Sequence, residues 1–413
     1  MYGLRRVVIT GMGAICSAGH TVEEFWNSLL QGNCGIDRIT HFDPTAFATQ
    51  IAAEVKNFDA GTHFNSKDVK KMDRYCHFAV ISAREAMKNS GLDLNQIDPT
   101  RMGVIYGAGI GGLSTMEKQH GNYLQGGPSK ISPFVIPMMI IDMVAGLISM
   151  EFNLKGPNFS VVSACATGSH CIGEAGKTIA LGEADIIMAG ASEAAITPLG
   201  IGGFTSMKAL SRNNSNPKKA SRPFDMNRDG FVMGEGGGTV ILEEYEHAKA
   251  RGAKIYGELV GYGASGDAYH MTQPAPEGEG AARAIKAAIK TAGIAPEQIG
   301  YYNAHGTSTK YNDLFETQAL KSVLGQGAYK LPVSSTKAVT GHMLGAAGAV
   351  ELIACLKALE TGILPPTWNY ETPDPECDLD YIPNQPRESK LTHAMSGSLG
   401  FGGHNVALII SKI

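Results

Sequence analysis

The run Ala83–Leu92 (AREAMKNSGL) and the apolar run Arg101–Tyr106 (RMGVIY) that follows it have a similar pair in the second half of the chain. The counterpart is Ile285–Ile294 (IKAAIKTAGI), followed by Gln298–Tyr302 (QIGYY). Each copy predicts a helix that ends at a glycine and a strand that leads into a loop of small residues. Internal similarity of this kind is typical of a duplicated architecture. The sequence therefore predicts two similar halves, each of the α/β class.

A second, looser similarity supports the duplication. Val162–Cys165 (VSAC) precedes one helix-like run, and Val333–Thr336 (VSST) precedes another that follows Gly341. Short apolar runs alternate with helix-like runs elsewhere in the chain, which is typical of α/β proteins. We expect residues 1–250 to form the N-terminal half and residues 251–413 the C-terminal half. Loops at the ends of equivalent strands should then face one another and build one composite site.

The composition fits a globular protein and excludes several other classes. Of the 413 residues, 43% are hydrophobic and 18% are charged, which is sufficient for more than one core. The 35 Lys+Arg against 39 Asp+Glu give a formal net charge of −4, so no overall positive field would attract nucleic acid or an anionic membrane. The seven cysteines contain no CxxC pair, which argues against a disulfide framework or a zinc site and predicts a reducing, cytoplasmic compartment.

Two apolar segments are candidates for a membrane or targeting signal. The run Val7–Thr10 is too short for a secretory signal and is predicted as the first strand. The longest apolar passage, Val135–Met150, is interrupted by Pro137, Asp142 and Gly146. It falls short of the roughly 20 clean residues that a transmembrane helix needs. We therefore expect a buried helix there and no membrane span.

Cys165 is the strongest candidate nucleophile. It lies where the strand-like run Ser160–Ala164 meets small residues and then a helix predicted to reach Leu181. A cysteine at such a junction points at a helix N-terminus, whose free N–H groups and macrodipole favour a thiolate. The adjoining N–H groups can also stabilise an oxyanion. A buried structural cysteine is the ordinary alternative, but these surroundings favour chemistry.

His305 and His342 each lie in a glycine-flanked loop, where a histidine has no evident packing role. A hydrogen-bonded core histidine is the alternative for either residue alone, and two such loops in similar positions favour a functional pair. Lys337 precedes a glycine-rich helix that we expect to be buried, so it needs a carboxylate partner. Glu316 and Glu351 are both candidates, and an exposed lysine is the alternative.

Four motifs stand in a fixed order along the chain. They are Val162–Gly168, Asn303–Thr309, Lys337 with Gly341–Gly348, and Gly400–Gly403, with further matches at Arg222–Asp225 and Arg228–Phe231. Together they resemble the β-ketoacyl-[acyl-carrier-protein] synthases of the thiolase superfamily, and most of all the synthase II type of dissociated fatty-acid synthesis. The likeness spans essentially the whole chain. It implies a duplicated thiolase-like fold whose two α/β halves form a core of α/β/α/β/α layers.

The resemblance implies an acyltransferase that elongates fatty acids on acyl carrier protein. Cys165 would accept the acyl group. His305 and His342 would serve the decarboxylation of malonyl-acyl carrier protein and the Claisen condensation that gives 3-oxoacyl-acyl carrier protein. Lys337 and Glu316 would support the histidines electrostatically. No metal and no resident cofactor are expected, because the phosphopantetheine arrives on the acyl carrier protein.

The same resemblance implies contacts with the substrate. The backbone N–H of Phe401 would help to form the oxyanion hole, and its side chain would act as a gate. Thr307 and Thr309 would hold the phosphopantetheine arm. The acyl tail would contact Ile110, Phe204 and Leu344. Two neighbours of the site depart from the family pattern, because His404 stands where threonine is common and Lys310 where proline is common.

We expect two macromolecular partners, an acidic acyl carrier protein and a second copy of the chain. The docking patch for the carrier is predicted at Lys67, Lys70, Lys71, Lys130 and Lys208. The apolar segment Phe134–Met150 predicts a homodimer interface, and residues near Pro133–Pro137 of the second subunit would complete the tail pocket. An ordinary core helix is the alternative for this segment, and a solvated charged face is the alternative for the lysines.

Three other functions fit parts of the sequence. Gly107–Gly112 (GAGIGG) matches the GxGxxG pattern of a dinucleotide-dependent oxidoreductase. The acidic ribose ligand expected about 20 residues further on is missing, since Pro128–Pro133 is predicted as a loop. A cysteine hydrolase with one histidine is disfavoured by the second histidine and by Lys337. A non-enzymatic chain-length partner would lack the nucleophile that Cys165 supplies.

Overall fold

Residues 4–413 are described by the computed structural model. Within them ten strands form one sheet with the order β10-β9-β13-β14-β8-β1-β7-β6-β4-β5. The first five strands in this order come from the second half of the chain and the last five from the first half. β1 and β8 meet at the centre of the sheet and pair only at Val8 with Glu258 and Ile9 with Gly257. The ten strands are β1 (Val7–Cys16), β4 (Met102–Gly107), β5 (Asn158–Phe159), β6 (Ile186–Glu193), β7 (Gly236–Glu244), β8 (Gly257–Gly266), β9 (Ile299–Asn303), β10 (Val333–Ser334), β13 (His393–Gly400) and β14 (His404–Ser411).

Helices separate and cover the two half sheets, and two short ribbons lie outside them. The helices are α1 (Val22–Gln31), α2 (Ser66–Val69), α3 (Arg74–Ser90), α4 (Leu113–Gly126), α5 (Val135–Met139), α6 (Met143–Phe152), α7 (Thr167–Ala180), α8 (Pro198–Ser206), α9 (Tyr245–Ala250), α10 (Glu279–Ala292), α11 (Lys310–Leu324), α12 (Lys337–Thr340) and α13 (Ala347–Thr361). The ribbons pair β2 (Asp37–Arg38) with β3 (Ile51–Ala52), and β11 (Ile363–Leu364) with β12 (Arg387–Glu388).

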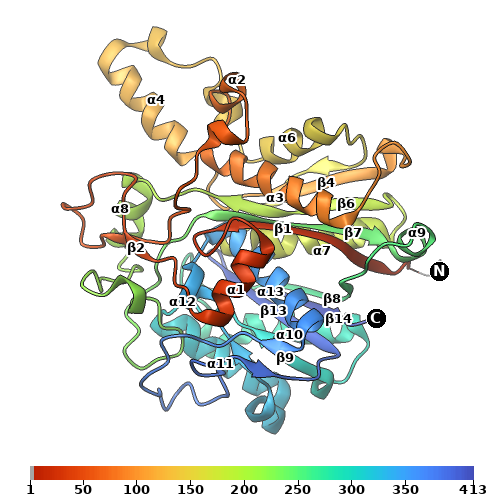
Figure 1. Ribbon diagram of the computed structural model, residues 1–413. Helices are drawn as coiled ribbons and strands as arrows, with labels where there is room; N and C mark the ends of the chain where they lie inside the picture. The colour runs from red at the N-terminus through yellow and green to blue at the C-terminus, as the bar shows by residue number, and fades with distance from the viewer. Residues whose placement is uncertain (1–3) are drawn as a thin grey trace.

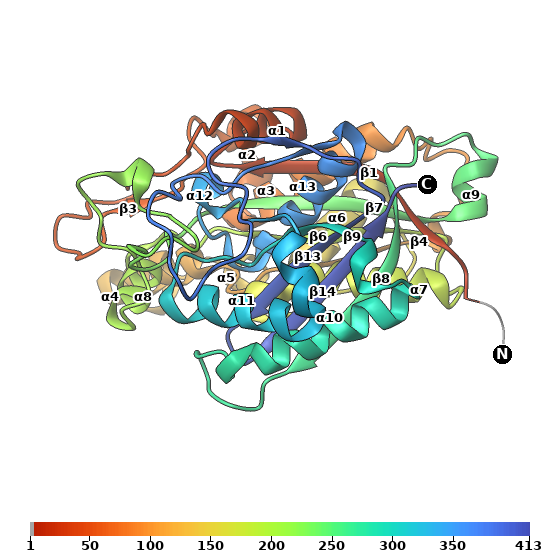
Figure 2. The same ribbon diagram turned by 90° about the horizontal axis from the view of Figure 1, so that it is seen from below.

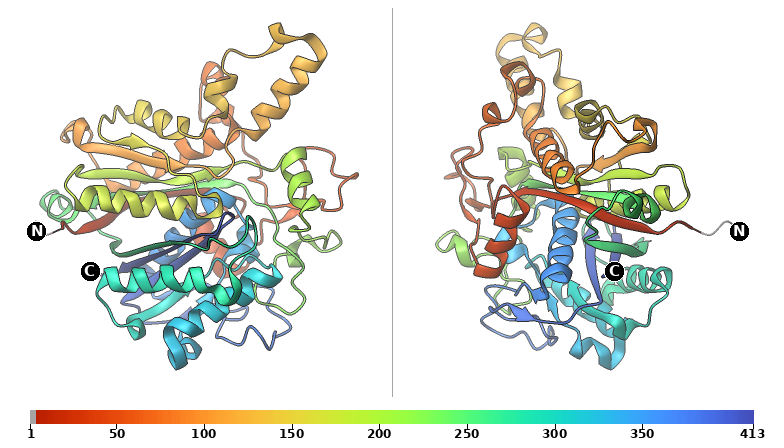
Figure 3. Two further views of the ribbon diagram at one scale, coloured as in Figure 1. Left: turned by 180° about the vertical axis from the view of Figure 1, so that it is seen from behind. Right: turned by 45° about the vertical axis from the view of Figure 1, so that its right-hand side comes forward.

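The helices arrange the core in five layers. α3 and α6 cover the outer face of the N-terminal half sheet (Figure 1), and α10 and α11 cover the outer face of the C-terminal half sheet (Figure 2). α7 and α13 pack against each other and against strands of both halves, so they form the central layer (Figure 3). The predicted α/β class and α/β/α/β/α layering are therefore confirmed. The boundary at residue 250 stays a prediction; α9 lies between β7 and β8 in this region.

The two matching helices of the duplication end in the same way. α3 begins after Asp73, whose carboxylate accepts a hydrogen bond from the N–H of Tyr75, and ends at Gly91 with φ +64°. α10 ends at Gly293 with φ +66°. Both glycines adopt the left-handed conformation that terminates a helix at no steric cost. The helix and strand that were predicted in each half are thus present in both.

The second pair of similar segments, which precede the two central helices, is also present in the structure. Its residues correspond in a different alignment from the one that the sequence predicts. The 3₁₀ turns η4 (Ala164–Ala166) and η9 (Leu344–Ala346) each lead directly into a central helix, α7 or α13. Ala164 has φ +50° and Leu344 has φ +46°, which is unusual for residues with a side chain. The structural counterpart of Cys165 is therefore Gly345, and not Thr336 as the sequence comparison predicted. The offset arises because α12 and the segment after it lie between β10 and η9.

The apolar passage from residue 135 to residue 150 is divided between α5 and α6. α6 buries Val144, Ala145 and Ile148 in the core beneath it, while the interface predicted for this segment stays a prediction. Ile136 in α5 is 55% exposed and Met150 is 68% exposed. Within residues 4–413 no helix combines the length and the apolar character needed to cross a membrane.

Candidate active site

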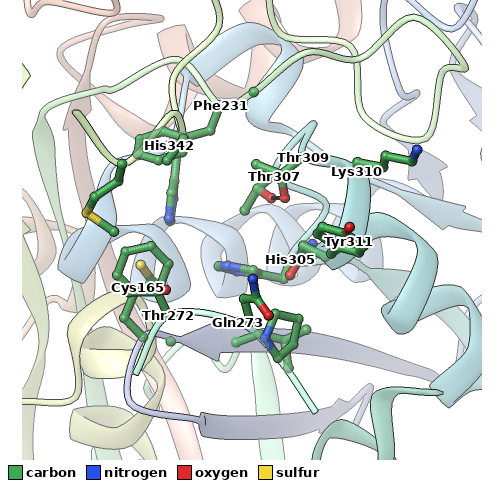
Figure 4. Close-up of a pocket in the computed structure, with 18 of the residues that line it drawn as sticks. Cys165, Phe231, Thr272, Gln273, His305, Thr307, Thr309, Lys310, Tyr311 and His342 are labelled. Atoms are coloured by element: carbon green, nitrogen blue, oxygen red, sulfur yellow. Dashed lines mark hydrogen bonds between the residues drawn. The ribbon is translucent and has the colours of Figure 1, made fainter. Parts of the chain in front are cut away.

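Loops from both halves of the chain line one cavity of about 520 Å³. The N-terminal half contributes Cys165 and Phe204, and the C-terminal half contributes the two histidines, the two threonines and the loop around Phe401. Figure 4 shows the side chains of Cys165, His305 and His342 turned toward the same space. The composite site predicted from the duplication is therefore present.

Cys165 lies in η4, directly before α7, and is only 7% exposed. Gly400 approaches this turn so closely that a Cβ there would lie 2.6 Å from the carbonyl oxygen of Ser163 and 3.3 Å from the nitrogen of Cys165. Glycine at the end of β13 thus brings the following N–H, that of Phe401, to the sulfur, where it lowers the thiol pKa. This N–H and that of Cys165 are the two donors expected of an oxyanion hole.

Burial opposes the thiolate that the helix N-terminus favours at Cys165. Burial raises the pKa of the Cys165 thiol to about 12, and the positive charge of Lys337 and the N–H of Phe401 oppose this rise only in part. The loss of hydration in the closed cavity outweighs the favourable helix N-terminus. The free thiol is therefore protonated at neutral pH, and its proton has to leave when the sulfur reacts.

The two histidines form a buried pair of neutral rings. Their ring centroids lie 5.1 Å apart with the planes at 87°, and each ring has a buried Nδ1 without a partner among the described residues. Burial and the charge of Lys337 lower the pKa of both His305 and His342 well below the ordinary value. A neutral imidazole carries one N–H, so each ring can donate one hydrogen bond without being protonated to the imidazolium.

The backbone of each histidine is fixed by a different element. The N–H of His342 donates to the carbonyl of Val232 (2.7 Å), and its own carbonyl accepts from the N–H of Gly234 (2.9 Å). The N–H of His305 donates to the carboxylate of Glu316 in α11 (2.7 Å), which also accepts from Gly306 (2.8 Å). Burial raises the pKa of Glu316 to about 7.

Lys337 is paired with Glu351, which settles the choice that the sequence left open. The ammonium of Lys337 forms a buried ion pair with the Glu351 carboxylate, and the lysine is 1% exposed. The alternative of a solvent-exposed Lys337 is therefore excluded. Glu316 binds the His305 backbone instead, together with the hydroxyl of Tyr302 (2.9 Å). Lys337 therefore acts on both histidines through its charge, and Glu316 acts on His305 through its backbone.

The predicted substrate contacts lie at the cavity, with one exception. The hydroxyls of Thr307 and Thr309 are 2.9 Å apart and both residues line the cavity. The ring of Phe401 lies 6.1 Å from that of Phe204, which is also a lining residue. Ile110 does not line the cavity. It packs one layer behind, in the apolar cluster that contains Cys165, Phe204 and Leu344.

The five lysines predicted for docking are all exposed, and they lie in two places. Lys67 is in α2, Lys70 and Lys71 follow it, and Lys130 ends the 3₁₀ turn Pro128–Lys130. Lys208 follows α8 and lines the cavity mouth. Figure 1 shows α2 and the end of α4 well apart from α8.

Glu193 is a residue at the site that sequence reasoning missed. Its side chain, at the end of β6, is fully buried and accepts hydrogen bonds from the N–H groups of Gly109 (2.8 Å), Ile110 (3.1 Å) and Gly111 (3.1 Å). These are the N–H groups that the GxGxxG alternative would offer to a pyrophosphate, so this loop is already occupied by an anion of the chain itself. The local sequence holds no signal for the contact, because the partners are more than 80 positions apart.

Comparisons with known proteins agree with this geometry. The model of the β-ketoacyl synthase N-terminal domain matches residues 4–248, and that of the C-terminal domain matches residues 256–371. The chain is 52% identical over 409 residues to the 3-oxoacyl-[acyl-carrier-protein] synthase 2 of Coxiella burnetii and 51% identical over 408 residues to that of Synechocystis. The alignments cover 99% of this chain and 99% and 98% of those proteins.

Solved structures show the same relation. A ketosynthase bound to a hexaketide, in complex with its type II PKS acyl-carrier protein, has a TM-score of 0.93 at 37% identity, covering 99% of this chain and 100% of that one. A β-ketoacyl synthase from Burkholderia phymatum also has a TM-score of 0.93, at 36% identity and the same coverage. The chain therefore belongs to the β-ketoacyl synthases, the family of condensing enzymes that its motifs predicted.

Proposed function

We propose that Cys165 carries the growing acyl chain as a thioester while His305 and His342 assist the decarboxylation that drives each condensation. The observation that carries this proposal is the convergence of one thiol and two neutral imidazoles on a single cavity. The proposal assigns the steps of the family's activity, condensation in fatty-acid elongation, to particular residues of this chain.

In the first half-reaction the sulfur of Cys165 attacks the thioester carbonyl carbon of an acyl group on the carrier. The bond between that carbon and the phosphopantetheine sulfur breaks, and this sulfur leaves with the proton that the Cys165 thiol gives up. The N–H groups of Cys165 and Phe401 hold the carbonyl oxygen while it bears negative charge. Because Cys165 is only 7% exposed, its thioester is shielded from water once formed.

In the second half-reaction the malonyl group loses carbon dioxide. The electron pair of the broken carbon–carbon bond forms an enolate, whose oxygen accepts hydrogen bonds from His305 and His342. The enolate carbon then attacks the Cys165 thioester, and the cysteine sulfur leaves and regains a proton. Neutral histidines suit this step because they donate hydrogen bonds without protonating the carbon that has to react.

Intact-mass spectrometry tests the covalent step. Wild-type protein incubated with an acyl-acyl carrier protein should gain the mass of one acyl group, and Cys165→Ser should not gain it as a thioester. Cys171 lies on α7 and donates a weak hydrogen bond to the carbonyl of Val161, outside the cavity, so Cys171→Ser is the matched control and should still be acylated. Acylation of the Cys165→Ser protein at the wild-type rate would disprove the assignment.

We also propose an acyl carrier protein as the partner that delivers both substrates. The similar ketosynthase solved with an acyl-carrier protein supports this, as do the exposed lysines near the cavity mouth and on α2. Because the phosphopantetheine arm comes with the carrier, the chain needs no cofactor of its own for this chemistry. Thr307 and Thr309 are the residues we assign to that arm.

A homodimer in the cytoplasm is the assembly we propose. β5 is the edge strand of the ten-stranded sheet, both its residues are exposed, and Phe159 and Val162 are 43% and 51% exposed. Ile136 of α5, in the predicted 133–137 segment, is a further exposed apolar residue. The seven cysteines are all free, as expected in a reducing compartment. Light scattering that gives the mass of one chain would disprove the dimer.

A further inference from the structure

Glu193 is the most heavily bonded carboxylate near the cavity that the proposed mechanism does not use. It is 0% exposed. One oxygen accepts from the N–H groups of Ile110 and Gly111 at 3.1 Å each, and the other accepts from Gly109 at 2.8 Å and Gly345 at 3.1 Å. No lysine or arginine pairs with it among the described salt bridges, so backbone N–H groups alone balance its charge.

The four N–H groups belong to two separate pieces of the site. Gly109, Ile110 and Gly111 form the loop after β4, and Gly345 belongs to η9, next to Leu344. A Cβ at Gly109 would lie 2.7 Å from the Glu193 carboxylate and 3.1 Å from the nitrogen of Gly345. The loop and the turn are therefore in direct contact, and one side chain fastens them to each other.

Both fastened pieces carry an apolar side chain that belongs with the acyl tail. Ile110 and Leu344 lie in one cluster with Cys165, and Leu344 also lines the cavity. The loop also contacts the apolar segment before α6, because the N–H of Gly112 donates a hydrogen bond to the carbonyl of Met139 (3.2 Å). A shift of the Glu193 carboxylate would thus move Ile110 and Leu344 together.

The second half of the chain uses a carboxylate in the same manner. Glu316 accepts from the N–H groups of His305 and Gly306, in the loop that follows β9, the counterpart of β4. There the carboxylate fixes a loop that carries a reacting group. By the same geometry Glu193 fixes a loop that carries a wall of the tail site.

We infer that Glu193 is a positioning residue for acyl-chain length, because it holds the Ile110 loop and the Leu344 turn against each other and against Cys165. The inference rests on the proposed function, since it assumes that the cluster around Cys165 receives the acyl tail. Removing the negative charge should loosen this wall without altering the histidines. It also removes a charge that helps to raise the pKa of the Cys165 thiol, so the thiol itself is not a neutral reference.

Glu193→Gln is the first variant, because it keeps the shape and converts one acceptor oxygen into an amide donor that opposes the backbone N–H groups. Glu193→Asp is the second, because its carboxylate is one methylene shorter and withdraws from the same donors. Glu85→Gln is the matched control. The Glu85 carboxylate also accepts from two backbone N–H groups, those of Ala14 (2.8 Å) and Val22 (2.9 Å), but lies outside the cavity.

The measurement is the KM and kcat of each protein over a series of saturated acyl-acyl carrier proteins from short to long. For Glu193→Gln we expect KM for the longest accepted primers to rise about tenfold relative to the shortest, the size of losing a hydrogen bond to a charged group. The kcat for the shortest primer should stay near wild type. If Glu193→Gln does not fold, Glu193→Asp should show the same selective loss.

A loss that is equal for all chain lengths, or a profile that matches Glu85→Gln, would overturn the inference and leave Glu193 a purely structural residue. An unchanged ratio of long to short primers in both Glu193 variants would overturn it as well. Failure of the proposed function has a different signature, because the wild-type protein itself would then form no acyl-enzyme.

Discussion

Lys337→Met removes the positive charge from the buried pair with Glu351 while keeping a side chain of similar length. Both partners are almost inaccessible, with side chains 1% and 2% exposed. The second oxygen of Glu351 already has no hydrogen-bond partner. The variant therefore leaves a buried carboxylate that has lost the one cation paired with it among the described residues.

Removing one partner of such a pair costs about 3–5 kcal/mol of unfolding free energy. An unfolding entropy of about 2.1 cal/mol/K per residue, over 413 residues, corresponds to roughly 0.9 kcal/mol for each degree of Tm. The expected fall in Tm is therefore roughly 3–6 °C. This is readily measured, although it is a small change for the loss of a buried ion pair, because the chain is long.

The loss should depend on pH in a defined direction. Burial raises the pKa of Glu351 in the folded protein even with Lys337 present, and removing Lys337 raises it further. A carboxyl with a raised folded pKa weakens the fold as the pH rises from its unfolded pKa, about 4.3, toward the folded pKa. The destabilisation should thus be small near pH 4 and complete above the folded pKa.

Calorimetric or circular-dichroism melting at several pH values measures the effect, and the double variant Lys337→Met/Glu351→Met is the control. The double variant should regain most of the lost stability, because it buries no unpaired charge. In the single variant the pKa of His305 and His342 should rise, moving the acid limb of malonyl decarboxylation to higher pH. A double variant less stable than the single one, together with an unmoved acid limb, would refute the reasoning.

Three further outcomes follow from the site. His305→Ala and His342→Ala should each slow malonyl decarboxylation on the order of 100-fold, measured as carbon dioxide release, while self-acylation suffers less. Unchanged release in both would remove them from the mechanism. Lys70→Glu with Lys71→Glu should raise KM for carrier-bound substrates in a salt-dependent way and spare small thioesters, whereas equal effects on both would exclude docking. Ile110→Phe should shorten the accepted chains without slowing short primers, and a profile identical to wild type would contradict a wall role.

Local sequence patterns predict those features of the structure that depend on residues close together in the chain. Gly91 and Gly293 end their helices through their own backbone conformation, so a helix followed by glycine could be recognised in both halves. The position of Cys165 between a strand and a helix is equally local. The effect of burial on its thiol could not be predicted in this way, because burial depends on segments from the other half, such as the Gly400 loop, which no local pattern reveals.

Long-range pairings were beyond the same patterns. Lys337 had two candidate partners because a buried cation accepts any carboxylate that the fold brings near it, and only the docking of α12 against α13 selects Glu351. The similarity between the VSAC and VSST segments was real, yet the α12 insertion displaced its register. Glu193 gave no signal at all, since its donors are backbone N–H groups, which every sequence has.

The duplication explains why this chain holds one reactive turn and not two. η4 and η9 have the same backbone shape, and each opens a central helix. In η4 the turn carries Cys165, and its N–H remains available for an oxyanion. In η9 the corresponding residue is Gly345, whose N–H is already bonded to the Glu193 carboxylate. The Glu193 side chain thus already occupies the N–H that would correspond to the oxyanion donor of Cys165, and the second turn serves as a wall for the chemistry at the first.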